Sequence, residues 1–134
     1  MVEWYYKYIT DRILHFDLQG VQHKVKANMG FPQGGVCSAL FWAVAFDGAV
    51  EIINKNEING NAFADDCGAV IGGSHLERMV SKLQKMTDEL TDWGQECGLQ
   101  FNSSQTVVVH FTRRKKIPSK KLKINGQEIE FKNC

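Results

Sequence analysis

The sequence has few of the features that mark secreted, metal-stabilised or membrane-spanning chains. Its four cysteines, Cys37, Cys67, Cys97 and Cys134, include no Cys-x-x-Cys pair and no histidine at ligand spacing. This excludes a recognisable structural zinc site and a disulfide framework, so an intracellular compartment is expected, with nucleus and cytoplasm not distinguished. The longest apolar run, Val36 to Phe46, has 11 residues and is far too short to span a bilayer. No signal peptide, internal repeat or low-complexity segment is visible.

The composition is that of one ordinary globular domain. The chain has 134 residues, of which 43% are hydrophobic and 23% charged. Its net charge of +1 is unevenly spread, because residues 1–110 carry 8 basic against 13 acidic side chains and residues 111–134 carry 8 against 2. The basic end predicts a surface for a polyanion. A solvated, charged strand edge is the alternative from charge alone.

Two adjacent carboxylates stand between two short apolar runs. Asn61 to Ala64 precede Asp65 and Asp66, and Cys67 to Ile71 follow them. The pattern predicts a tight hairpin with both aspartates at its tip. Like charges on neighbouring turn residues repel, so the tip is expected to be solvated or to hold a cation. An acidic surface turn and a metal site are both consistent with this pair alone.

Apolar periodicity predicts the remaining elements. Helices are expected over residues 1–12, 36–54 and 74–97, the second buried and the third begun by a Ser74/Glu77 capping box and ended by Gly98. Strand pairs are expected at 13–18 with 21–27, and at 122–124 with 128–131 around Asn125-Gly126. Residues 99–102 and 106–111 suggest a strand interrupted at 103–105.

A glycine-rich turn, Gly30 to Gly35, leads into the second helix. Its Pro32 fixes the backbone, and its glycines allow another molecule to approach the main chain closely. A turn of this kind before a helix offers free N–H groups to a phosphate or to a base pair. Turns of this composition are also common without any function.

Three blocks, taken in order, closely resemble the palm of reverse transcriptases, in particular those of jockey-like non-LTR retrotransposons. Phe31 to Ala39 resembles their Pro-Gln-Gly-Gly-Val-x-Ser-Pro block, and Phe63 to Asp66 their Tyr-Ala-Asp-Asp box. Trp93 to Asn102 resembles their Trp-x-x-x-x-Gly-Leu-x-x-Asn block. The resemblance covers essentially the whole chain.

The resemblance implies an RNA-directed DNA polymerase that uses an RNA template, a DNA primer and dNTPs. Asp65 and Asp66 match the positions of catalytic carboxylates that bind Mg²⁺, with Mn²⁺ possible as a substitute. Four residues match the block that packs on the incoming nucleotide and the template base: Phe31, Pro32, Gln33 and Gly34. Six basic residues are expected to face nucleic-acid phosphates: Arg113, Arg114, Lys115, Lys116, Lys120 and Lys121.

The chain also departs from the family pattern. The family's other metal-binding aspartate lies well upstream, in a pattern ending Ala-Phe-Asp that this sequence lacks, and Asp17 is too close to the glycine-rich block to match it. Phe63 replaces the usual tyrosine, Ala39 a proline, and Gln105 a lysine that resembles a proton donor to pyrophosphate. Residues 1–134 are therefore interpreted as a partial domain that works only within a longer polypeptide. The alternatives are a non-catalytic retroelement remnant that at most binds nucleic acid, and an unrelated α+β domain.

The expected fold class is α+β. We expect a partial polymerase palm, in which an antiparallel sheet is packed on one face by the two long helices at 36–54 and 74–97. Missing neighbours should leave an exposed apolar surface.

Overall fold

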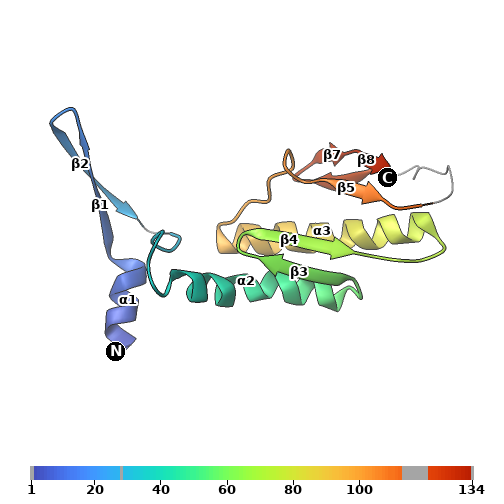
Figure 1. Cartoon of the computed structure of the whole chain (residues 1–134), viewed down its shortest axis with the longest axis horizontal. Helices are drawn as coiled ribbons and strands as arrows, with labels where there is room; N and C mark the ends of the chain where they lie inside the picture. Colours follow the sequence, from blue (N-terminus) through green and yellow to red (C-terminus); the bar gives the residue numbers. More distant parts are fainter. Residues whose placement is uncertain (1, 28, 113–120, 134) are drawn as a thin grey trace. The chain divides into compact units, whose positions relative to one another are not determined.

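The α+β class is confirmed by the computed structural model, which describes residues 2–27, 29–112 and 121–133. Three helices alternate with short strands in the order α1, β1, β2, α2, β3, β4, α3, β5, β6, β7, β8 (Figure 1). The chain divides into two compact units, residues 1–43 and 44–134, and each is described by itself. None of the described helices has the length and apolar character needed to cross a membrane.

The first unit begins with helix α1, Val2–Thr10, and a long two-stranded ribbon. Strand β1, Arg12–Leu18, pairs antiparallel with β2, Val21–Ala27, in register from Arg12↔Ala27 to Leu18↔Val21. Its turn is stabilised by Asp17, whose carboxylate accepts a hydrogen bond from the Gly20 N–H (3.0 Å). Almost every side chain of the ribbon is exposed, because no other described element of the first unit covers either face.

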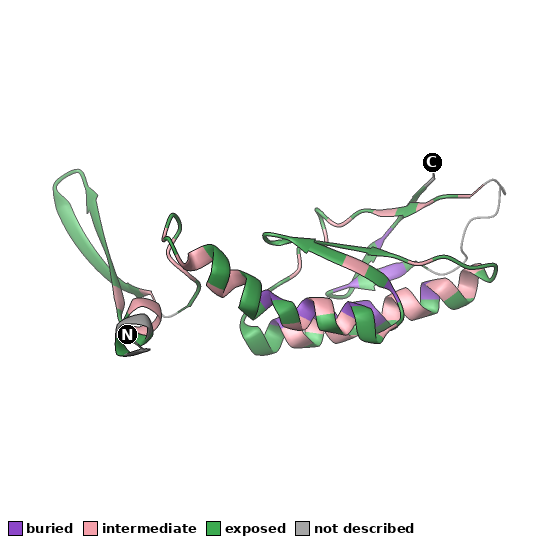
Figure 2. Cartoon of the chain, turned by 60° about the horizontal axis from the view of Figure 1, so that its bottom comes forward, coloured by how far each residue is buried: buried purple, intermediate pink, exposed green. Residues whose placement is uncertain are grey.

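Helix α2, Ser38–Lys55, passes from the first unit into the second. The apolar period predicted a buried helix, but only its second half is buried, through Phe46, Ala49 and Ile53. Leu40 and Val44 are exposed because nothing described packs on that face. Figure 2 shows this change along α2, from exposed to buried.

The second unit is organised around helix α3, Leu76–Cys97. Its apolar stripe includes the buried residues Val80, Met86 and Leu90. Gly98 ends the helix as predicted, in the left-handed conformation (φ 70°), and the next N–H, of Leu99, returns to the Gly94 carbonyl (2.7 Å). The predicted capping box is not formed: His75 occupies the N-cap, which leaves Glu77 one position short of the third helical residue that the box requires.

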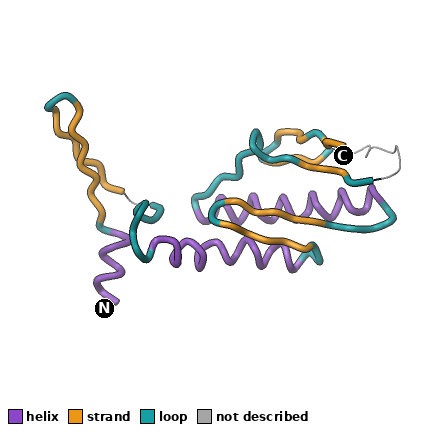
Figure 3. The backbone as a smooth tube through the Cα atoms, viewed as in Figure 1, coloured by secondary structure: helices purple, strands orange, loops and turns teal. Residues whose placement is uncertain are grey.

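The strands of the second unit form separate pairs, which Figure 3 shows beside the two long helices. Strand β3, Asn59–Phe63, pairs antiparallel with β4, Asp66–Val70, and β6, Leu122–Ile124, pairs antiparallel with β7, Gln127–Ile129. Strand β5, Val108–His110, pairs parallel with β8, Phe131–Asn133. The pairs β6–β7 and β3–β4 confirm two predicted hairpins. Asn125 and Gly126 both have positive φ (50° and 76°), as a type I′ turn requires.

The core lies where α3 meets the carboxyl-terminal strands. Leu122, Ile124 and Ile129 form a buried cluster, against which Leu83, Phe101 and Val108 pack. The predicted strand at 99–102 is absent, because the Asn102 side chain accepts hydrogen bonds from Ser104 and its carbonyl accepts the N–H groups of Gln105 and Thr106. An interruption was predicted at 103–105, and the structure has a turn there.

Candidate active site

The two candidate catalytic carboxylates lie at the tip of the β3–β4 hairpin. Phe63 pairs with Asp66, so the turn consists of Ala64 and Asp65. Ala64 has a positive φ of 53°, whereas Asp65 does not. Positive φ at the first turn residue alone is the sign pattern of a type II′ turn, which normally has glycine there. The backbone at the tip is therefore strained next to both aspartates.

Strand alternation determines which residues share a face with Asp66. Phe63, Asn61, Gly68 and Asp66 lie on one face, because cross-strand partners and every second residue point the same way. A Cβ on Gly68 would come within 2.6 Å of the Asn61 Oδ1, so the Asn61 amide lies across the glycine. Phe63, 85% exposed, stands on the same face as Asp66. This outward face is therefore open to a large ligand.

The opposite face of the hairpin points to helix α2. A Cβ on Gly60 would overlap the Ile53 side chain, which sets how closely β3 approaches the helix. Cys67, on this inner face, is adjacent to Asp66; partial desolvation and then the Asp66 carboxylate raise the pKa of its thiol. At neutral pH the Cys67 thiol is therefore protonated and adds no charge to the tip.

The donor set at the tip suits a hard cation. Asp65 and Asp66 are both exposed, and Mg²⁺ binds through one or two carboxylates while keeping several waters or phosphate oxygens. Among the described residues, no group of three or more His, Cys, Asp or Glu side chains could hold a metal ion. The two aspartates can thus supply part of a coordination shell, and the remaining ligands have to come from substrate or from other residues.

The predicted nucleotide-binding residues form one loop in the first unit. Phe31 and Pro32 are half-buried, and Gln33 and Gly34 are exposed, with Gly34 at φ 76°. The Phe31 ring stacks on Phe41, the ring centroids 5.7 Å apart. The Gln33 amide and the Gly34 backbone are therefore exposed to solvent, while the stacking of Phe31 on Phe41 holds the beginning of the loop.

Three residues that sequence reasoning missed hold this loop in place. The Arg12 guanidinium donates to the carbonyls of Met29 (2.9 Å) and Gly30, at the beginning of the loop. Ser38 donates to the Pro32 carbonyl (2.6 Å), and its Oγ lies 3.2 Å from the Tyr8 hydroxyl oxygen. Ser38 is the serine of the Phe31–Ala39 block, which was the available signal for it. No periodic pattern identifies Arg12, because its partners are backbone carbonyls 17 and 18 residues along the chain.

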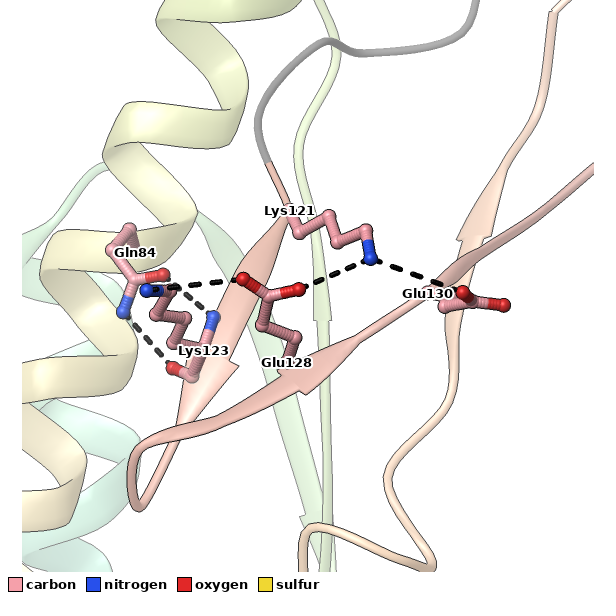
Figure 4. A network of polar contacts seen from close by, with 5 residues as sticks. All are labelled: Gln84, Lys121, Lys123, Glu128 and Glu130. Carbon is pink, nitrogen blue, oxygen red and sulfur yellow. Dashed lines mark hydrogen bonds and ion pairs between the residues drawn. The ribbon is translucent and has the colours of Figure 1, made fainter.

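The predicted basic surface is described at one position only. Arg113, Arg114, Lys115, Lys116 and Lys120 lie outside the described residues. Lys121 is exposed, and its ammonium lies 3.0 Å from Glu128 and 3.9 Å from Glu130 (Figure 4). The hydrogen bond to Glu128 and the attraction between the two charges raise the pKa of Lys121. Its positive charge is therefore partly balanced within the β6–β7 hairpin.

The side-chain amide of Gln84, on helix α3, is hydrogen-bonded to the backbone of this hairpin. The Gln84 Nε2 donates to the Lys123 carbonyl (2.9 Å), and the Gln84 Oε1 accepts the Lys123 N–H (2.8 Å), as Figure 4 shows. The side chain thus takes the place of a neighbouring strand along β6. Lys123 also lies 3.9 Å from Glu128.

Asp17 was considered, and set aside, as a further metal ligand. In the structure its carboxylate accepts the Gly20 N–H in the turn of the β1–β2 ribbon, within the first unit. Gln105 is exposed in the turn after Asn102, with its N–H bonded to the Asn102 carbonyl.

Comparison with known proteins gave one family. The family model described as reverse transcriptase (RNA-dependent DNA polymerase) matches residues 2–130. No curated protein and no solved structure matched the chain. Because the matched range includes both the Gly30–Gly35 loop and the Asp65–Asp66 hairpin, the chain belongs to the reverse transcriptase family.

Proposed function

We propose that this chain is the palm portion of an RNA-directed DNA polymerase, and that Asp65 and Asp66 are its metal-binding carboxylates. The observation that carries the proposal is the adjacent, exposed pair at the tip of a strained hairpin, in a chain whose family match spans residues 2–130. The three sequence blocks further support an origin in a jockey-like non-LTR retrotransposon, acting inside the cell.

The aspartates would hold Mg²⁺, which supplies charge stabilisation for attack of a primer 3′-hydroxyl and for departure of pyrophosphate. Asp66 begins β4 and is positioned by its pairing with Phe63, whereas Asp65 is positioned by the turn itself. A site placed on a strand is more precise than one on a free loop. The hairpin thus orients two oxygen ligands before any substrate arrives.

The Gly30–Gly35 loop would contact the incoming nucleotide and the template base. Phe31 is preorganised by stacking on Phe41, and Arg12 and Ser38 fix both ends of the loop through backbone carbonyls. Exposed Gln33 and Gly34 then offer an amide and an approachable backbone. Fixing a loop before binding lowers the entropy cost of ordering it around a substrate.

The basic residues within 113–121 would contact RNA and DNA phosphates. To do so, Lys121 would have to leave its ion pair with the Glu128 carboxylate and bind a phosphate instead. The remaining metal ligand would come from outside residues 1–134. A metal site of this kind contributes several kcal/mol to transition-state stabilisation, so removing its ligands should slow synthesis by about a hundredfold or more.

The test is primer extension on an RNA template with Mg²⁺, using a polypeptide extended upstream to include an Ala-Phe-Asp strand. Asp65→Asn and Asp66→Asn, which keep side-chain shape, should each abolish most synthesis. Asp17→Asn is the matched control, because it removes a carboxylate that the structure places in a turn, and it should leave synthesis within about twofold. Equal synthesis by the Asp65→Asn/Asp66→Asn double variant and the unsubstituted protein would refute the assignment.

A non-catalytic remnant is the second candidate, and Gln105 is the observation that favours it. A glutamine cannot donate the proton that the corresponding lysine of the resembling block would supply. In that case the extended polypeptide would bind RNA in a salt-sensitive manner without Mg²⁺-dependent synthesis. Gln105→Lys separates the two candidates: restored synthesis means that the site is intact apart from its proton donor, and continued inactivity supports the remnant.

A further inference from the structure

Two hydroxyl groups in series join helix α1 to the Gly30–Gly35 loop. The Ser38 hydroxyl donates to the Pro32 carbonyl (2.6 Å), and the Tyr8 hydroxyl oxygen lies 3.2 Å from the Ser38 Oγ. A serine hydroxyl has one proton to donate, and Ser38 donates it to Pro32. The Tyr8 hydroxyl is therefore the donor to Ser38. We call this path, which lies within the first unit, the Tyr8 relay.

The contact between Tyr8 and the loop is close. A Cβ at Gly35 would overlap both the Tyr8 hydroxyl oxygen and the Ser38 Oγ, so the space beside this glycine is already filled. Tyr8 and Ser38 are both half-buried, and a hydrogen bond that is shielded from water is stronger than an exposed one. The Tyr8 hydroxyl reaches Ser38 only because position 35 has no side chain.

The Pro32 carbonyl is held by two donors. Besides the Ser38 hydroxyl, the Gly35 N–H donates to it (3.1 Å), and a carbonyl oxygen has two lone pairs to accept such bonds. The Ser38 N–H in turn donates to the Gly35 carbonyl (3.0 Å). These bonds hold the loop against the beginning of α2 and fix the direction of the Pro32 carbonyl.

A fixed carbonyl determines the direction of the N–H in the same peptide group. The bond between Pro32 and Gln33 is planar and trans, so the Gln33 N–H points opposite to the Pro32 C=O. With that carbonyl directed to Ser38, the N–H is directed away from Ser38. Gln33 is exposed, and its N–H has no hydrogen-bond partner among the described residues. The Tyr8 relay thus orients one available donor.

We infer that Tyr8 is a positioning residue for the incoming nucleotide. Through Ser38 it fixes the Pro32–Gln33 peptide group, whose N–H donates to an oxygen of the nucleotide. Tyr8 acts without touching the substrate. In the absence of its hydroxyl, the peptide group would rotate more freely, and nucleotide binding would have to order it first, at a cost in affinity.

This inference rests on the proposed assignment of the Gly30–Gly35 loop to the nucleotide, and its test does not require synthesis. The polypeptide extended upstream is bound to an RNA template with a primer that ends in a dideoxynucleotide, so that no chemistry follows. The dissociation constant of the next complementary dNTP is then measured with Mg²⁺ present. The metal-binding aspartates are tested by synthesis, so failure of that assignment and failure of this one are distinguishable.

Tyr8→Phe removes the hydroxyl and keeps the ring. It should raise the dissociation constant of the dNTP about three- to tenfold, as expected for the loss of one hydrogen bond, and that of the primer–template by less than about twofold. Ser38→Ala should also weaken dNTP binding. The double variant should bind dNTP no more weakly than Ser38→Ala, because both substitutions interrupt one path. Tyr6→Phe, at a 65% exposed position of the same helix, is the matched control and should change neither constant.

Amide hydrogen exchange on the 134-residue chain locates the effect. Tyr8→Phe should speed exchange of the Gly35 and Ser38 amides, which donate to the loop carbonyls, and should leave exchange in β1 and β2 unchanged. Tyr6→Phe should change none of these rates. Faster exchange throughout the first unit would mean that Tyr8 only stabilises the fold, and would overturn the inference.

Three binding results would also overturn it: the same dNTP affinity in Tyr8→Phe and the unsubstituted protein, additive losses in the double variant, or an equal loss of primer–template affinity. If the unsubstituted polypeptide binds no dNTP, the inference is wrong together with the assignment of the loop. If Tyr8→Phe does not fold, Ser38→Ala provides the same comparison with the same outcomes.

Discussion

At the scale of single residues, Ala64 is one of four described non-glycine residues with a positive φ, and the one that lies in the β3–β4 turn. Its φ of 53° lies in the left-handed region, where a Cβ is unfavourable and a glycine is not. The strain sits beside the proposed metal ligands, which is where proteins tend to retain it.

Replacing Ala64 by glycine should therefore stabilise the fold. Relief of the left-handed strain outweighs the added freedom of the unfolded chain, so Ala64→Gly should raise the free energy of unfolding by about 0.5–1 kcal/mol in urea denaturation. Ala62→Gly is the control. Ala62 has the extended backbone of strand β3, so this substitution should lower the free energy of unfolding by about 0.5–1 kcal/mol. A fall in stability for both variants would contradict a left-handed Ala64.

The Lys121–Glu128 pair makes a prediction about pH. The hydrogen bond and the attraction from Lys121 hold the pKa of Glu128 below its ordinary value. The pair therefore stabilises the fold above the unfolded pKa of Glu128, and this contribution is lost as the pH falls through the lower folded pKa. Lys121→Gln should raise the pKa of Glu128 in an NMR titration. Lys132→Gln, which removes a charge at a site with no ion pair among the described residues, should leave it in place.

At the scale of elements, close contact between β3 and α2 depends on a glycine. A Cβ at Gly60 would overlap Ile53, one of the most deeply buried side chains. Gly60→Ala should cost about 1–3 kcal/mol of unfolding free energy through overpacking. Gly72→Ala, where an added Cβ meets nothing within 4 Å, is the control and should change stability by less than about 0.5 kcal/mol. Similar losses for the two variants would show that β3 does not rest on Ile53.

The sequence predicted elements well where the signal is local. The β3–β4 and β6–β7 hairpins and the Gly98 helix end follow from residue types within a few positions, and the aspartates lie in the predicted hairpin. The N-cap of α3 is His75, one residue after the predicted Ser74, because a capping box is defined by spacing and not by the path of the preceding loop. The strand at 99–102 failed for a similar reason, since Asn102 side-chain bonds compete with strand pairing.

Long-range features were not predictable. The parallel pairing of β5 with β8 joins segments that are separated by the β6–β7 hairpin, and three-residue strands carry almost no alternation of their own. The hydrogen bonds from Arg12 to the Met29 and Gly30 carbonyls also follow from no sequence pattern, because every residue has a carbonyl that could accept them.

At the scale of the whole molecule, apolar surface is the dominant feature. Leu14, Phe16, Leu18, Val21 and Val25 are exposed on one face of the β1–β2 ribbon, and Phe63 and Phe111 are exposed elsewhere. Patches of this kind mark surfaces that normally bind another partner. The exposed apolar surface expected from the sequence is therefore present.

This surface should bind an apolar dye. We expect strong enhancement of 8-anilinonaphthalene-1-sulfonate fluorescence and concentration-dependent association of the isolated chain. Phe16→Thr with Leu18→Thr, which keeps β propensity on one ribbon face, should reduce both. Ile13→Thr with His15→Thr, on the other face, is the control. A monomeric chain without dye enhancement would contradict the exposed apolar face.

Strand β8 determines where a shortened form of this chain should end. It lies beyond residue 130, the last residue of the family match, yet it is the parallel partner that supports β5. A gene trimmed to the matched range would delete Phe131 to Asn133 and leave β5 without its neighbour on either side. Boundaries chosen by sequence similarity would then divide a sheet, and a soluble fusion or a crystallisation fragment should keep the last four residues.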